Sequence, residues 1–238
     1  MNPLVQLQQY GQSIWYDNIE RRLLAGGATG GLGRMIAEDG VLGLTSNPSI
    51  FEKAIGSSTD YDAEIGRLAA QGRSVNHIYE TLAIDDIRQA CDLLLPVFQR
   101  TNGVDGYASL EVSPHLAHQT EETIAEGRRL HAAVDRINVM IKVPGTPAGV
   151  PAIEELIGSG INVNVTLLFA QSAYEQAARA YIRGLERFAA SGGDLSKVAS
   201  VASFFVSRID GNADKRIEAL IAATDDPDVQ EMLHGLLA

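Results

Sequence analysis

The sequence predicts an α/β fold with a parallel sheet, built either as a doubly wound open sheet or as a (β/α)8 barrel. Short apolar segments alternate with amphipathic helical segments along the whole chain. Six strand–helix units can be counted, and that number taken by itself favours the open sheet. The 238 residues are 45% hydrophobic and 21% charged, an ordinary globular composition, and an α/β barrel often reaches this length as one domain. No repeat or interdomain linker divides the chain.

The predicted strands are short, apolar and bounded by polar or turn-forming residues. They lie at about 13–17, 41–45, 107–112, 139–143, 161–168 and 197–205. The predicted helices follow them, at about 4–11, 18–24, 32–38, from 48 onward, 60–71, 74–83, 84–101, 119–133, 151–157, 170–190, 213–223 and 227–237. The glycine-rich segment from Gly26 to Gly33 lacks the ending of a phosphate-binding loop, and Ile36 stands where a dinucleotide fingerprint needs glycine. We therefore interpret this segment as a flexible connection.

The charge and cysteine content exclude several functional classes. A net charge of −11 argues against non-specific binding to nucleic acid or to an anionic membrane surface, so an anionic substrate must meet a local cationic pocket. Cys91 is the one cysteine and lies in an apolar pattern, which predicts a packed core thiol and a reducing, cytoplasmic location. The N-terminus does not resemble a signal peptide, and no apolar run approaches the ~18 residues of a membrane span.

Polar side chains lie at or near the carboxyl ends of six successive predicted strands. They are Asp17, Asn47, Glu111, Lys142, the pair Asn164 and Thr166, and Ser203. In parallel α/β folds these strand ends meet at one edge, where active sites are built. Lys142 is unusual because it stands between Ile141 and Val143 in an apolar strand. It is either an edge-strand lysine facing solvent or a buried amine at a functional site.

A buried neutral lysine beside two carboxylates supports amine catalysis. The amine adds to a ketone, loses water and leaves an iminium ion that accepts electrons from a breaking carbon–carbon bond. The proton transfers require acids, and Asp17 and Glu111 are available. Alternatively, Asp17 caps a helix that begins at Asn18, and Glu111 is an exposed strand-end residue.

The other polar residues have functional and structural interpretations as well. Asn47, Asn164, Thr166 and Ser203 either hold sugar hydroxyls or a water, or satisfy hydrogen bonds at the strand ends. Arg208 either binds a phosphate through its guanidinium group or is simply exposed. His115 and His118 have no clear third ligand near them, so we expect no metal site.

Five motifs in these regions resemble the transaldolase family, in particular its longer bacterial form. They are Gly43–Phe51, Ser109–Pro114, Met140–Thr146, Asn162–Phe169 and Ala202–Asp210. They come in family order and spread over nearly the whole chain. The resemblance implies a (β/α)8 TIM barrel and a cofactor-free Schiff-base transferase of the pentose phosphate pathway. Such an enzyme transfers a dihydroxyacetone unit from sedoheptulose 7-phosphate or fructose 6-phosphate to an aldose phosphate.

The resemblance also implies a role for each acid, base and amine of the site. Lys142 forms the imine with the ketose, and Asp17 takes the proton from the C4 hydroxyl during cleavage. Glu111 moves protons through a water, and Thr166 holds that water.

The remaining four residues would bind the substrate. The resemblance implies that Asn47 and Asn164 orient its hydroxyls and that Ser203 lies beside the dihydroxyacetone unit. Arg208 would bind the phosphate.

The resemblance further implies that residues 1–238 form a single, incomplete barrel domain. About six of eight β/α units are present, and the seventh and eighth strands and a further basic phosphate-contacting residue have no counterpart. We therefore expect a C-terminally truncated or partial gene product, a homo-oligomer, or a barrel completed by another chain. The alternative functions are a related class I aldolase acting on sugar phosphates and an inactive partial barrel that serves in assembly or binding.

Overall fold

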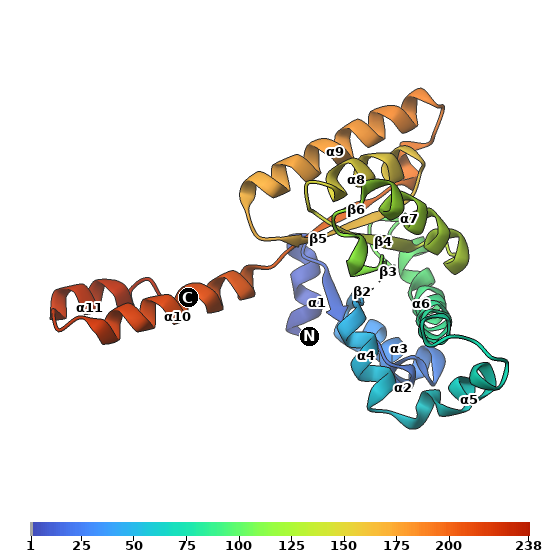
Figure 1. Ribbon diagram of the computed structural model, residues 1–238, viewed down its shortest axis with the longest axis horizontal. Helices are drawn as coiled ribbons and strands as arrows, with labels where there is room; N and C mark the ends of the chain where they lie inside the picture. The colour runs from blue at the N-terminus through green and yellow to red at the C-terminus, as the bar shows by residue number, and fades with distance from the viewer. Residues whose placement is uncertain (1) are drawn as a thin grey trace.

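A computed structural model describes residues 2–238 and contains one sheet of six parallel strands. The strands are β1 (Ile14–Asp17), β2 (Val41–Thr45), β3 (Tyr107–Glu111), β4 (Val139–Pro144), β5 (Val163–Leu168) and β6 (Ser200–Phe204), and they pair in sequence order from β1 to β6. A doubly wound sheet would reverse direction at a switch point, which this order does not contain. The sheet curls as an arc (Figure 1), so the prediction of a barrel-type fold with about six β/α units is confirmed.

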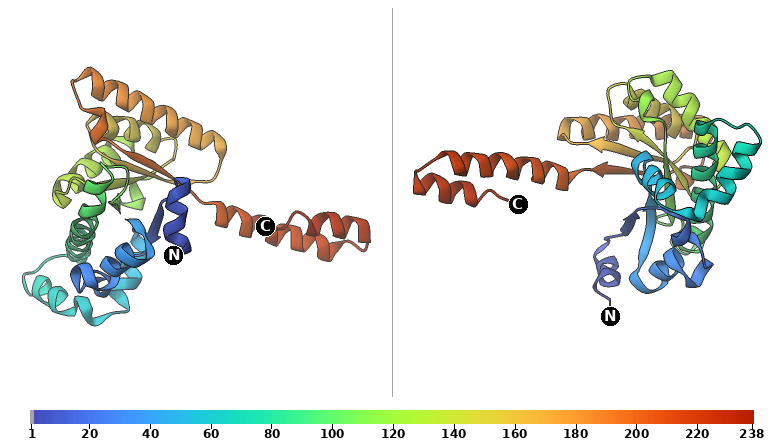
Figure 2. Two further views of the ribbon diagram at one scale, coloured as in Figure 1. Left: turned by 180° about the vertical axis from the view of Figure 1, so that it is seen from behind. Right: turned by 60° about the horizontal axis from the view of Figure 1, so that its bottom comes forward.

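Most helices follow the strands along the chain. Their bounds are α1 (Pro3–Leu7), α2 (Arg21–Leu24), α3 (Gly31–Arg34), α4 (Pro48–Gly56), α5 (Asp62–Ala70), α6 (Val75–Arg100), α7 (Thr120–Val134), α8 (Gly149–Gly158), α9 (Gln171–Ala190), α10 (Val206–Ala223) and α11 (Pro227–His234). Short 3-10 turns lie at Gln8–Tyr10, Gly27–Thr29, Thr59–Tyr61, Pro114–Leu116 and Leu195–Lys197, and a π turn at Met35–Asp39. Helices α6, α7, α8 and α9 cover the outer face of the arc and pack side by side in that order (Figures 1 and 2).

The strand register brings polar residues to one edge of the sheet. Asp17 pairs with Thr45, and Glu111 pairs with Lys142, which in turn pairs with Asn164. Every residue of β4 is buried, and so are the first four of β3, because helices cover one face and the curled sheet encloses the other. Cys91 belongs to the same core and is fully buried, as predicted, and burial raises the pKa of its thiol to about 12.

Helix α6 differs from the prediction of two helices at 74–83 and 84–101, because it is one helix of 26 residues. Ser74 caps it by accepting a hydrogen bond from the backbone N–H of His77. The buried residues Leu82, Ala83 and Ile84 cross the predicted boundary without a gap. A continuous apolar face therefore keeps the helix intact where the sequence suggested a break.

The glycine-rich segment connects α2 to α3, as predicted, and its flexibility stays a prediction. It forms a 3-10 turn and the start of α3. Gly31 has a φ of +40°, and a Cβ there would lie 1.9 Å from the carbonyl oxygen of Leu23. A Cβ on Gly33 would lie 2.2 Å from the carbonyl oxygen of Gly27. The glycines allow two backbone segments to approach closely, which a search for nucleotide motifs cannot detect.

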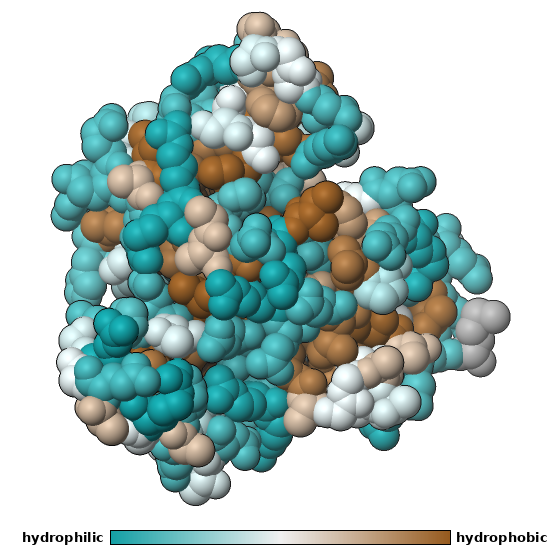
Figure 3. Space-filling model, turned by 90° about the vertical axis from the view of Figure 1, so that its right-hand side faces the viewer, coloured by the Kyte–Doolittle hydropathy of each residue, from teal (hydrophilic) through white to brown (hydrophobic). Residues whose placement is uncertain are grey.

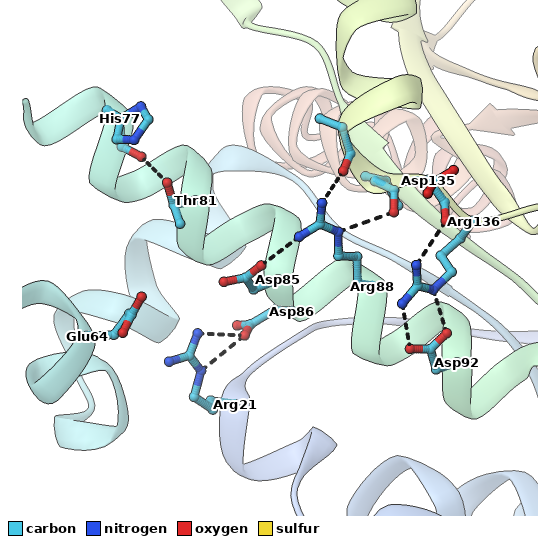
Figure 4. Close-up of polar contacts among 12 residues, drawn as sticks. Arg21, Glu64, His77, Thr81, Asp85, Asp86, Arg88, Asp92, Asp135 and Arg136 are labelled. Atoms are coloured by element: carbon cyan, nitrogen blue, oxygen red, sulfur yellow. Dashed lines mark hydrogen bonds and ion pairs between the residues drawn. The ribbon is translucent and has the colours of Figure 1, made fainter. Parts of the chain in front are cut away.

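A polar network centred on the buried Asp86 joins α2, the turn before α5, and α6. Asp86 is fully buried, and its carboxylate accepts hydrogen bonds from Arg21 at 3.0 and 3.1 Å and from the Tyr61 hydroxyl at 2.8 Å. Figure 4 shows Arg21 directed at Asp86. It also shows Arg136 donating two hydrogen bonds to the carboxylate of Asp92, which lies further along α6. Burial raises the pKa of Asp86, while Tyr61 and Arg21 oppose that rise.

Helices α10 and α11 form an arm that projects from the body (Figures 1 and 2). Neither helix contains a buried residue, and α10 starts at Val206, seven residues before the predicted start at 213. Apolar side chains are exposed along the arm, among them Leu220 and Met232. Figure 3 shows the side of the molecule opposite the arm, which is mostly hydrophilic with hydrophobic patches between the polar residues. Within residues 2–238, no helix combines the length and apolar character needed to span a membrane.

Replacing Arg21 by Met is expected to lower the free energy of unfolding by about 3 kcal/mol at neutral pH, because it leaves the buried Asp86 carboxylate without its cation. The pKa of Asp86 is already raised, so at low pH the carboxyl is protonated and the loss is smaller. The loss grows as the pH rises and the group ionises. Urea unfolding across this pH range tests the prediction. Replacing the exposed Arg22, whose partner Glu20 is on the surface, serves as the control.

Candidate functional site

A cavity of about 900 Å³ opens at the carboxyl ends of the strands. The residues that line it come mainly from β1, α2, the β2–α4 connection, α4, β3, β4, β5 and the start of α10. Six of the eight predicted site residues are among them: Asp17, Asn47, Glu111, Lys142, Thr166 and Arg208. The parallel strands therefore bring together groups that lie up to 191 positions apart in the sequence, Asp17 and Arg208 being the extremes.

Lys142 is buried in the middle of the sheet, with 5% of its surface exposed. Strands β3 and β5 flank its strand β4, so Lys142 is not an edge-strand residue. Its Nζ donates a hydrogen bond to the main-chain carbonyl of Ser46 at 3.0 Å and lies 3.5 Å from Oε2 of Glu111. The amine therefore has two defined partners and faces the cavity.

Glu111 lies beside Lys142 in the register of β3 and β4, and its side chain is 12% exposed. Burial raises the pKa of this carboxyl, the Lys142 cation and its hydrogen bond lower it, and the negative charge of Asp17 raises it. The net effect is a raised pKa, a perturbation typical of groups that exchange protons at functional sites. Glu111 is therefore a half-buried partner of the amine rather than an exposed strand end.

Asp17 ends β1 and is exposed at the cavity. Its carboxylate accepts a short hydrogen bond from the hydroxyl of Thr45, its neighbour on β2. No helix begins at Asn18, since α2 starts at Arg21 with Glu20 as its capping residue, so the alternative role of Asp17 as a helix cap is excluded. The carboxylate lines the cavity, and its negative charge raises the pKa of Glu111.

Thr166 and Asn47 line the cavity from opposite sides of Lys142. Thr166 is 1% exposed and follows Asn164 on β5. Asn47 caps α4, because its side-chain oxygen accepts a hydrogen bond from the backbone N–H of Ile50 at 3.0 Å. The cap fixes the orientation of the Asn47 side chain at the cavity wall, so both interpretations of this residue are compatible.

Asn164 and Ser203 are not among the described residues that line the cavity. The Ser203 hydroxyl donates to Oδ1 of Asn164 at 2.9 Å, and Nδ2 of Asn164 donates to Oγ of Ser109 at 3.1 Å. Asn164 and Ser109 are fully buried. In this structure the two predicted residues belong to a hydrogen-bonded chain behind Lys142, and their contact with substrate stays a prediction.

Three cationic side chains surround the cavity mouth of this acidic chain. Arg208 lies in the first turn of α10, with its guanidinium group 4.3 Å from the centre of the Phe205 ring. Arg22 and Lys53 also line the cavity, and neither was identified from the sequence. Spacing along the chain gave no sign of them, because α2 and α4 bring them to the mouth only through tertiary packing. These side chains place positive charge at the cavity, where Arg22 forms an ion pair with Glu20 at 2.8 Å.

The described residues contain no group of three or more His, Cys, Asp or Glu side chains placed to hold a metal ion. His115 belongs to the short turn Pro114–Leu116, and both His115 and His118 are exposed. The polar groups that converge at the cavity are an amine, carboxylates, hydroxyls and amides. This set fits the class of enzymes that form covalent imines between a lysine and a carbonyl compound.

Comparison with known proteins identifies the family. Residues 14–233 match the family model described as transaldolase/fructose-6-phosphate aldolase. The chain belongs to this family, which confirms the resemblance seen in the five motifs.

Several curated relatives carry the name transaldolase. A protein of Nostoc sp. named "Transaldolase 2" is 50% identical over 222 residues, covering 93% of this chain and 58% of its own length. "Transaldolase" of Trichodesmium erythraeum is 48% identical over 99% of this chain and 61% of its own length. "Transaldolase" of Thiobacillus denitrificans is 51% identical over 92% of this chain and 60% of its own length. The chain thus spans somewhat more than half the length of these relatives.

Replacing Glu111 by Gln is expected to slow trapping of Lys142 by dihydroxyacetone and borohydride about 100-fold at neutral pH, because the proton acceptor beside the amine is lost. In the unmodified chain the trapping rate should rise with pH as Glu111 ionises. That rise should occur above the pH at which an exposed glutamate titrates, since the Glu111 pKa is raised. Mass spectrometry of the adduct across a pH series measures both effects.

The exposed Glu121 on α7 provides a matched control, and its replacement by Gln should leave the profile unchanged. A Glu111→Gln profile that coincides with that of the unmodified chain would rule out a proton transfer by Glu111.

Proposed function

We propose that this chain carries the Schiff-base site of a transaldolase. The site would transfer a dihydroxyacetone unit from sedoheptulose 7-phosphate or fructose 6-phosphate to an aldose phosphate, as in the pentose phosphate pathway. The observation that supports the proposal best is the buried Lys142 amine, held 3.5 Å from Glu111 at the wall of a cavity of about 900 Å³. The relatives named transaldolase and the family match support the same reaction.

The first chemical step is imine formation at Lys142. Glu111 accepts a proton from the lysine ammonium, and the neutral amine then attacks the ketone carbon of the donor sugar. Loss of the former carbonyl oxygen as water gives the iminium ion. Thr166, at the same wall, would hold the water through which Glu111 moves protons.

Asp17 would act in the cleavage step. Its carboxylate, oriented by the Thr45 hydroxyl, takes the proton from the C4 hydroxyl as the bond between C3 and C4 breaks. The electrons move into the iminium ion and leave an enamine on Lys142. That enamine attacks the aldehyde of the acceptor, and hydrolysis of the new imine frees the product and the lysine.

Binding would use the remaining predicted residues. Asn47 would orient substrate hydroxyls at the wall, with Asn164 and Ser203 supporting the dihydroxyacetone unit from behind. Arg208 would contact the phosphate from the arm, where Arg22 and Lys53 add positive charge at the mouth. We assign no cofactor to this reaction. A cytoplasmic location is consistent with the one cysteine, which is buried and free.

We also propose that residues 1–238 are a single barrel-like domain whose two free strand edges are covered in the working protein. Strands β1 and β6 each have a sheet neighbour on one side only. An uncovered parallel strand leaves backbone hydrogen-bonding groups unpaired and favours association. Two further β/α units would close the arc, supplied by a further segment of polypeptide, by a second copy of the chain or by another chain.

Replacing Lys142 by Met is expected to abolish the borohydride-trapped adduct with fructose 6-phosphate and to reduce turnover at least about 10⁴-fold, since the buried amine beside Glu111 is lost. Replacing the exposed Lys197 by Met should leave both unchanged. Product analysis with and without erythrose 4-phosphate separates transfer from an aldolase reaction that releases free dihydroxyacetone. A folded unmodified chain without any adduct would contradict the proposed function.

Covering the free edges should increase turnover at least about tenfold, because a closed barrel orders the cavity wall and excludes water. The test compares the 238-residue chain with the same chain extended by the part of the Nostoc relative that follows the matched region. Hydrogen exchange should slow at β1 and β6 in the extended protein. Equal turnover and equal exchange in the two proteins, with a monomeric short chain by light scattering, would contradict the proposal.

A further inference from the structure

Ser46 makes two hydrogen bonds at the site, one through its main chain and one through its side chain. It lies between β2 and α4 and is fully buried. Its carbonyl oxygen accepts the hydrogen bond from Nζ of Lys142 at 3.0 Å. Its hydroxyl donates to the carbonyl oxygen of Ser109 on β3 at 2.7 Å. The same residue therefore connects the reactive amine to the neighbouring strand.

The side chain of Ser46 continues the sheet beyond the end of its strand. The last pair of the β2–β3 ladder is Thr45 with Ser109. Ser46 lies beyond the paired residues of β2, and its hydroxyl supplies a further hydrogen bond to β3, at the carbonyl oxygen of Ser109. The adjacent residue, Asn47, is held from the other side by the cap of α4. The peptide group of Ser46 is thus fixed between a strand and a helix, which determines the direction of its carbonyl.

We propose that Ser46 is a positioning residue for Lys142, an inference that rests on the proposed Schiff-base function. A neutral amine has two N–H bonds and one lone pair. The Ser46 carbonyl accepts one N–H, and Glu111 on β3 exchanges the proton that the amine must lose. The lone pair is then directed into the cavity, toward the carbonyl carbon of the ketose.

The same carbonyl has a role after the imine forms. The lone pair forms the N–C bond, the ketone oxygen takes up a proton, and one proton leaves nitrogen. The resulting hydroxyl is protonated and departs as water, leaving an iminium ion with a single N–H. That N–H stays on the Ser46 carbonyl, which sets the plane of the C=N bond. Cleavage requires the breaking C3–C4 bond to stand across this plane, so the orientation of the carbonyl controls the reacting geometry.

The test replaces Ser46 by Ala, which removes the hydroxyl anchor and keeps the carbonyl. The expected result is a trapping rate with dihydroxyacetone and borohydride about tenfold to 100-fold lower, and a kcat lowered by a similar factor. The KM for fructose 6-phosphate should change less than about twofold, because ground-state binding is retained. Dihydroxyacetone carries no phosphate, so its trapping does not depend on the cationic mouth of the cavity.

Ser200 offers a matched control. Its hydroxyl donates to the carbonyl oxygen of Val163 at 2.8 Å, the same kind of bond between neighbouring strands, at the amino end of β6. Ser200→Ala should lose similar thermal stability to Ser46→Ala and keep the trapping rate of the unmodified chain. Ser46→Thr retains the hydroxyl, and in a folded sample it should restore trapping.

Two results would overturn the inference, and they are distinguishable. If the unmodified chain is trapped and folded Ser46→Ala is trapped equally fast, Ser46 does not position the amine. If the folded unmodified chain gives no adduct on Lys142 with either ketose, the Schiff-base function fails and the positioning role fails with it.

Discussion

The burial of the Lys142 amine is the constraint on which the rest of the site depends. An amine with 5% of its surface exposed persists in a sheet interior only when partners compensate for the lost water. Here the Ser46 carbonyl and the Glu111 carboxylate are those partners, and they come from the connection after β2 and from β3. Both partners reach the amine because the strands are parallel, are paired in sequence order and end at the same edge. The parallel arrangement of the strands therefore brings both partners to the amine.

The site separates orientation from proton exchange. Groups that do not titrate orient the polar side chains. The Ser46 carbonyl orients the Lys142 amine, and hydrogen bonds run from the Ser203 hydroxyl through the Asn164 amide to the Ser109 hydroxyl. Carboxylates handle protons, and their environments differ. Glu111 is half-buried with a raised pKa, whereas Asp17 is exposed and accepts a hydrogen bond from Thr45. Two acids with different surroundings can serve two different proton transfers on one substrate.

Much of this arrangement could be predicted from the sequence. The apolar segments and their polar ends identified all six strands, and the motifs identified the family. The strand count taken by itself favoured an open sheet, because strand order is a tertiary property, and only the family motifs predicted the barrel. It predicted a break in α6 that continuous packing removes, and it gave no sign of the close backbone approaches at Gly31 and Gly33. Ser46 was not identified as a site residue from the sequence, since no local pattern reveals that a main-chain carbonyl faces a lysine 96 residues away. Arg22 and Lys53 were missed for the same reason.

The arm formed by α10 and α11 has an energetic consequence for the site. None of its residues is buried, so the helices are stabilised by local interactions and can unfold without unfolding the sheet. Arg208, which lines the cavity, lies in the first turn of that arm. A ligand that engages Arg208 binds only molecules in which this turn is formed, so ligand affinity and local helix stability are thermodynamically linked. The proposed imine site thus lies in the buried sheet, and the proposed phosphate contact lies in a helix without buried residues.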